Sequence, residues 1–82
     1  MIIKLYAVRD KLTEFGGPVG FKEDKVAKRW FTQLMADKKA NYGDPKDYEL
    51  YIVGSMDTEK GNVIGTAVQE VELIMKGEDL DV

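Results

Sequence analysis

Residues 24–38 read DKVAKRWFTQLMADK and carry the clearest periodicity in the chain. Apolar side chains recur there at helical spacing, which predicts an amphipathic α-helix with one apolar face. The members of that face are Val26, Ala27, Trp30, Phe31, Leu34 and Met35. Asp24 is a typical N-cap residue, so we expect the helix to begin after it. The apolar face predicts a helix that packs against a core.

The opposite face of this helix is basic. At about 100° per residue it carries Lys25, Lys28 and Arg29, with Lys39 further along and no acid among them. Cations on successive turns can contact successive phosphates of a nucleic acid. A solvated face that keeps a small protein in solution is the alternative, and the sequence leaves both interpretations open.

A β-rich run, IIKLYAV, occupies residues 2–8 and predicts the first strand. Alternation along a strand would place Ile3, Leu5 and Ala7 against the core and Tyr6 on the outward face. A glycine-rich loop is expected over residues 9–23, with Phe15 and Phe21 attaching it to the core.

After the helix, the sequence predicts a hairpin. Residues 48–56 form a strand with Leu50 and Ile52 inward and Tyr51 outward, and residues 63–67 return after a turn closed by Asp57 and Gly61. Residues 68–76 suit either a short helix or a strand. The expected fold is α+β: a small antiparallel sheet in the order β-α-β-β plus a C-terminal element, with one amphipathic helix on one face. Residues 1–77 would form a single domain and residues 78–82 an acidic tail.

Composition excludes several classes of function. The chain has 82 residues, no Cys and no His, so disulfides, thiolate zinc sites, imidazole bases and His-ligated metals are excluded. The carboxylates show no metal-ligand spacing or acid–base pair. We therefore expect no metal, no cofactor and no enzyme activity.

Charge is distributed unevenly along the chain. The net charge is −3, but residues 1–42 hold nine basic and five acidic residues, whereas residues 43–82 hold three and ten. A basic half and an acidic half could face two partners, or could neutralise each other in the fold. No run approaches the roughly 20 apolar residues of a membrane span, and residues 1–5 lack the pattern of a signal peptide. The sequence therefore predicts a cytoplasmic protein without a membrane partner.

Two further sets of residues are candidates for binding. Tyr6 and Tyr51 share the strand face expected to point away from the helix, where aromatics could stack single-stranded bases or be buried in a homodimer. The tail is the second candidate, and it is formed by Glu78, Asp79, Leu80, Asp81 and Val82. It reads as a frayed, solubilising end or as a partner-binding segment.

An ordered set of residues resembles a known family. The set includes Tyr6, Val8 and Asp10, then Phe15 and Pro18, then Ala27, Arg29 and Phe31, then the run DPKDYELY at 44–51, and finally Gly54, Asp57 and Gly61. Over roughly residues 5–62 the chain resembles the small nonstructural protein of gokushovirus-type microviruses, which are phages with single-stranded DNA. It departs from that pattern at Asp44, where the family would have His, and at Met56, where it would have an aromatic residue.

The resemblance implies a protein made in the cytoplasm of the infected bacterium and absent from the capsid shell. It also implies DNA binding, in single-strand synthesis or its handover to packaging, and no catalysis. Our physical inference assigns phosphate contacts to six cations and base stacking to Tyr6 and Tyr51. The cations are Lys25, Lys28, Arg29, Arg9, Lys11 and Lys22. The protein would act as an oligomer, most simply a dimer. The alternative is an interaction module that binds a viral replication or capsid protein, or a host replication factor, through its acidic half.

Overall fold

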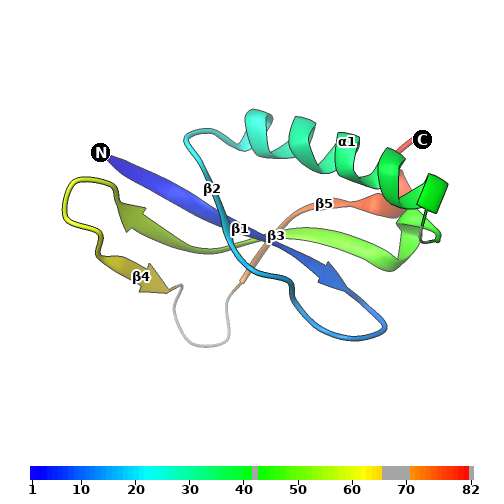
Figure 1. Cartoon of the computed structure of the whole chain (residues 1–82), viewed down its shortest axis with the longest axis horizontal. Helices are drawn as coiled ribbons and strands as arrows, with labels where there is room; N and C mark the ends of the chain where they lie inside the picture. The colour runs from blue at the N-terminus through cyan, green and yellow to red at the C-terminus, as the bar shows by residue number, and fades with distance from the viewer. Residues whose placement is uncertain (42, 66–70, 82) are drawn as a thin grey trace.

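The computed structural model describes residues 1–41, 43–65 and 71–81, with the backbone alone described at 38–41. Two 3₁₀ turns, η1 and η2, accompany the strands and the helix. The order is β1 (Ile2–Asp10), β2 (Val19–Phe21), α1 (Asp24–Asn41), η1 (Pro45–Asp47), β3 (Tyr48–Asp57), β4 (Val63–Gly65), β5 (Glu72–Lys76) and η2 (Gly77–Asp79). The α+β prediction is confirmed, because the described residues form an antiparallel sheet with α1 along one face (Figure 1).

β3 is the central strand of the sheet. One edge pairs with β1 along its whole length, and β1 pairs on its far side with β2. The other edge of β3 is divided between two strands: β5 pairs with residues 49–52 and β4 with residues 54–56. Every pairing is antiparallel, so β3 fixes the register of the sheet.

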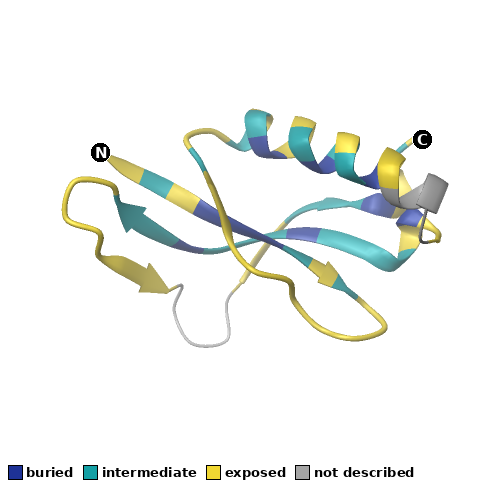
Figure 2. Cartoon of the chain, in the orientation of Figure 1, coloured by how far each residue is buried: buried dark blue, intermediate teal, exposed yellow. Residues whose placement is uncertain are grey.

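The core lies between α1 and the sheet. Its fully buried side chains are Tyr6, Ala27, Phe31, Met35 and Leu50. Ala27, Phe31 and Met35 are spaced four residues apart, so they form one stripe along the helix. Figure 2 shows the buried part of α1 turned toward the strands, whereas β4 is exposed along its length. The apolar face predicted for the helix is confirmed.

The orientation predicted for the first strand is wrong. Tyr6 lies opposite Ile52 and belongs to the core under α1, so Leu5 and Ala7 point to the other face of the sheet. Leu5 and Ala7 are nevertheless buried as well. Because β1 has buried apolar residues on both of its faces, apolar alternation does not reveal which face meets the helix.

Other elements differ in their bounds from the prediction. Asp24 is the first helical residue rather than the N-cap, and the backbone carbonyl of Glu23 accepts from the Ala27 N–H over 3.3 Å. β2 lies within the segment expected to be only a loop. Of residues 68–76, which suit either a helix or a strand in the sequence, residues 72–76 form strand β5. Residues 66–70 lie outside the described residues.

The predicted hairpin turn is confirmed. The Asp57 carboxylate accepts from the backbone N–H of Glu59 over 2.9 Å and of Lys60 over 3.3 Å. Gly61 has a φ of 79°, which is the left-handed conformation that glycine adopts without steric cost. This turn holds β4 beside the end of β3.

The chain end packs against η1. Gly77 is buried, and a Cβ there would collide with the Pro45 carbonyl oxygen and lie 3.0 Å from the Tyr48 carbonyl oxygen. Leu80 packs against the core. The boundary expected between residues 77 and 78 therefore falls inside η2. In the described part of the chain, no helix is long and apolar enough to cross a membrane.

Candidate nucleic-acid interface

The helix presents three of the predicted cations to solvent. Lys25, Lys28 and Arg29 are exposed on the first two turns of α1. Lys25 pairs with Glu23 over 3.5 Å. Within the described residues, neither Lys28 nor Arg29 forms an ion pair, although the charge of Lys28, after Tyr6 and Lys4, contributes to the lowered pKa of Asp24.

Lys22 adds a fourth cation just before the helix. It is exposed and has no carboxylate partner in the described parts of the chain. The two acids that follow it are already engaged, since Glu23 pairs with Lys25 and Asp24 pairs with Lys4 over 3.2 Å. We call Lys22, Lys25, Lys28 and Arg29 the basic helix site.

Arg9 and Lys11 do not join the basic helix site. Arg9 lies on the face of the sheet away from α1, opposite Glu49 in register, and its guanidinium carbon is 5.8 Å from the centre of the Phe15 ring. Lys11 is exposed in the loop after β1, where its backbone N–H donates to the Asp47 carbonyl over 2.8 Å. The six predicted cations therefore divide into the four of the basic helix site and two others, Arg9 and Lys11, that lie away from it.

Tyr6 cannot stack bases, because its side chain is fully buried. Its hydroxyl donates to Asp24 Oδ1 over 2.5 Å, and its ring packs on Phe21 with the ring centres 5.8 Å apart. A buried aromatic ring with its polar tip bonded at the rim is a common use of tyrosine. The sequence interpretation of Tyr6 is thus corrected from binding residue to core residue.

The Tyr6–Asp24 contact also shifts the titration of both groups. Burial raises the pKa of Tyr6 above its ordinary value, and the hydrogen bond to Asp24 raises it further. The same hydrogen bond, followed by that from Lys4, lowers the pKa of Asp24 below its ordinary value. At neutral pH the contact is therefore a neutral hydroxyl donating to a carboxylate, and it ties the start of α1 to β1.

Tyr51 lies on the sheet face away from α1, as predicted. It is opposite Ala7 in register, and its hydroxyl donates to Glu49 Oε1 over 3.1 Å. Phe15 packs edge-on against it at 5.4 Å between ring centres. The prediction that Phe15 and Phe21 both attach the loop to the core is confirmed for Phe21, which packs on Tyr6 and Trp30, and is wrong for Phe15. The sequence signal that could have revealed the position of Phe15 is the presence of two side chains that it contacts, Arg9 on β1 and Tyr51 on β3.

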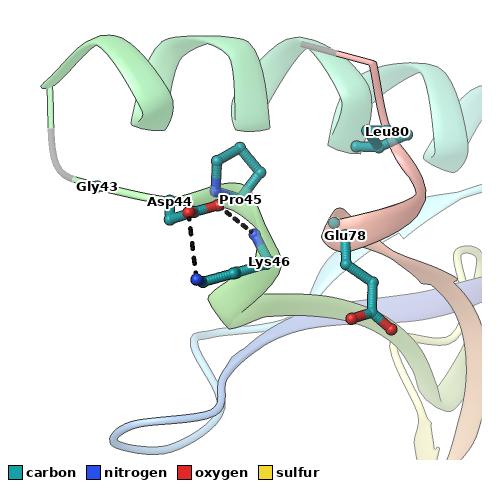
Figure 3. Close-up of a pocket in the computed structure, with 7 residues that line it drawn as sticks. Gly43, Asp44, Pro45, Lys46, Glu78 and Leu80 are labelled. Carbon is teal, nitrogen blue, oxygen red and sulfur yellow. Dashed lines mark hydrogen bonds and ion pairs between the residues drawn. The ribbon is translucent and has the colours of Figure 1, made fainter.

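Part of the predicted tail lines a surface hollow. A cavity of about 590 Å³ is bordered by η1, by Gly43 and Asp44, and by Gly77, Glu78 and Leu80 (Figure 3). Its charged groups are paired, since Asp44 contacts Lys46 over 3.7 Å and Glu78 contacts Lys76 over the same distance. Asp79 and Asp81 are exposed, and Val82 lies outside the described residues.

The fold and the basic helix site define a small α+β protein with a cationic helix exposed on one side. The family model for the Phage ORF5 protein matches residues 3–80, and the chain belongs to that family. It is therefore a bacteriophage protein. No curated protein and no solved structure is similar enough to count as a match.

Proposed function

We propose that this phage protein is a non-catalytic single-stranded DNA-binding accessory protein that contacts phosphates through the basic helix site. The observation that carries the proposal is the exposure of Lys22, Lys28 and Arg29 without ion-pair partners in the described residues. The resemblance to gokushovirus-type nonstructural proteins adds the context of single-strand synthesis or handover to packaging.

The spacing of the cations along α1 suits contact with neighbouring phosphates. Lys25 and Arg29 are one turn apart, which is about 6 Å along the axis, and Lys28 lies between them. A flexible single strand can place neighbouring phosphates at such a spacing. Three or four contacts with a chain of net charge −3 would give weak, reversible binding, which suits a protein that must release DNA to a later step.

The test is fluorescence anisotropy of a labelled 30-mer single strand, titrated over a range of salt concentrations with duplex as the control. Three phosphate contacts predict that log affinity falls with log salt with a slope of about −2. Lys28→Glu should weaken binding about tenfold or more and reduce the slope. Trp30, the one tryptophan, follows Arg29 in α1 and gives a label-free signal of the same event.

A matched control separates local contact from net charge. Lys60→Glu changes the total charge by the same amount, but Lys60 lies in the exposed β3–β4 turn. We expect it to leave the affinity within about twofold of wild type. A slope near zero, or equal losses for Lys28→Glu and Lys60→Glu, would contradict phosphate binding at the helix.

The hollow beside the tail favours a second candidate function. A viral replication or capsid protein, or a host replication factor, could seat against Glu78 and Leu80 while contacting the exposed Asp79 and Asp81. Under this alternative, charge reversal at Glu78, Asp79 and Asp81 abolishes binding of that partner in a pairwise pull-down with purified proteins. Retained binding would exclude the tail as the site.

A further inference from the structure

The face of the sheet away from α1 is built from four rows of side chains in register. The charged row at one end is Arg9–Glu49–Lys76. The three apolar rows are Ala7–Tyr51–Leu73, then Gly20–Leu5–Gly54–Gly65, then Ile3–Met56–Val63. We call this surface the open face. In Figure 1 the described helix α1 lies on the opposite side of the strands.

The apolar rows of the open face carry no ionisable side chain except the Tyr51 phenol. Leu73 is 41% exposed and Val63 is 63% exposed, and Phe15, which leans on Tyr51, is 39% exposed. Leu5 and Ala7 are already buried within the chain, so the exposed apolar part of the open face is formed by the side chains around them. An exposed apolar patch of a few hundred Å² on a monomer often marks a functional surface. Three members of the middle row are glycines, so Leu5 supplies the only side chain of that row.

Two polar groups at the edge of the open face already have partners. The Tyr51 hydroxyl donates to Glu49, and Lys76 pairs with Glu78, whereas Arg9 lies over the Phe15 ring at the charged end. Burying a polar group costs little when its hydrogen bond is already made. The three apolar rows can therefore lose their water without burying a charged group, because the charges of the open face lie in the single row at one end.

The area of the open face limits the size of the interface that it can form. The chain exposes 5500 Å², whereas a folded monomer of its mass is expected to expose about 5,000 Å². Four rows across three strands cover roughly 400 Å² in projection. A standard interface buries about 800 Å² per partner, so a stable complex must engage the whole face and its flanks.

We propose that a second copy of this chain packs sheet to sheet on the open face, related by a two-fold axis. Flat antiparallel sheets pack in this way about 10 Å apart, and an isologous contact lets one apolar patch cover itself. DNA fits this surface less well, because its only cations, Arg9 and Lys76, flank Glu49 in a single row at one end. In the dimer both α1 helices, with their basic helix sites, remain on the outside.

Neighbouring residues of β4 provide a matched test. Val63 and Ile64 are both 63% exposed, but Val63 is in the open face while Ile64 lies opposite Ser55 on the helix side. Sedimentation velocity from 1 to 200 µM, without DNA, should show a concentration-dependent dimer. Val63→Lys should raise its dissociation constant at least about 100-fold, and Ile64→Lys should leave it within about threefold.

Leu73→Lys is the second variant, since it lies on β5 at the other end of the open face. It should dissociate the dimer as Val63→Lys does, with unchanged far-ultraviolet circular dichroism showing that both variants fold. A wild-type chain that is monomeric at 200 µM would overturn the proposal, as would equal effects of Val63→Lys and Ile64→Lys. A monomer whose DNA affinity falls in Tyr51→Ala would assign the open face to DNA instead. The dimer proposal and the DNA proposal can fail independently. The Lys28→Glu variant should lose DNA affinity but still dimerise as wild type does.

Discussion

Replacing Tyr6 with Phe tests how the start of α1 is held on the sheet. The change removes one hydroxyl and keeps the ring that packs on Phe21. A hydrogen bond to a charged group contributes about 1.5–3 kcal/mol when it is shielded. Asp24 has 40% of its side chain exposed and keeps its contact with Lys4, so we expect a contribution below this range, about 1 kcal/mol.

For a domain of this size, a loss of about 1 kcal/mol lowers the midpoint of thermal unfolding by about 4–8 °C. The assay is thermal and urea unfolding followed by circular dichroism at a dilute concentration. Tyr51→Phe is the matched control, because it removes a hydroxyl that donates over a longer distance to Glu49. We expect its effect to be the smaller of the two.

The pH dependence gives a second readout of the same contact. Asp24 has a lowered pKa in the folded chain, so its contribution is present above the ordinary value of 3.8 and is lost as pH falls below it. Tyr6 has a raised pKa, so its contribution is present below the ordinary value of 10.0 and is lost as pH rises above it. The stability difference between wild type and Tyr6→Phe should therefore be largest from about pH 5 to 9 and shrink on both sides.

Two results would refute this reasoning. If Tyr6→Phe were as stable as wild type at pH 7, the contact would contribute nothing to folding. If its deficit were constant from pH 2 to 11, the loss would come from packing rather than from the hydroxyl and the carboxylate.

Three further substitutions test the packing. Gly77→Ala should destabilise the chain by about 1–3 kcal/mol, because its methyl group would meet the backbone of Pro45 and Tyr48; urea unfolding measures this, and an unchanged midpoint would contradict the close packing of η2 on η1. Gly61→Ala should cost about 1–2 kcal/mol through its positive φ, and the same experiment would show no loss if the turn could relax. Leu50→Ala should cost about 2–5 kcal/mol by opening a cavity under α1, and a two-state melt at the wild-type temperature would contradict the assignment of Leu50 to the core.

The sequence predicted the helix and the hairpin well because each depends on local signals. The apolar stripe of α1 and the turn at Asp57 and Gly61 are both set by residues within a few positions of one another. Leu50 was also placed correctly, since its strand has one face under the helix. These features need no knowledge of distant partners.

The predictions that were wrong or incomplete concern features that depend on contacts between residues far apart in the sequence. Tyr6 lies in the core opposite Ile52, and Asp24, which accepts its hydroxyl, lies in a different element. β2 is three residues long and exists through its pairing with β1, which local propensity does not reveal. At the candidate site, the sequence selects the cations by residue type, but only the register shows that Arg9 and Lys28 belong to different faces.

The position of β3 has a consequence for how the chain reaches its native state. Its two long neighbours come from opposite ends of the sequence: β1 precedes β2 and α1, and β5 follows the β4 hairpin. The hairpin and the helix can form early from local contacts, whereas β1 must close a loop that contains all of α1 before it can pair. We therefore expect folding on a timescale of milliseconds to seconds, with β3 exposing an unpaired edge until the N-terminal strand docks. During synthesis, that edge is the segment that would first meet another nascent copy.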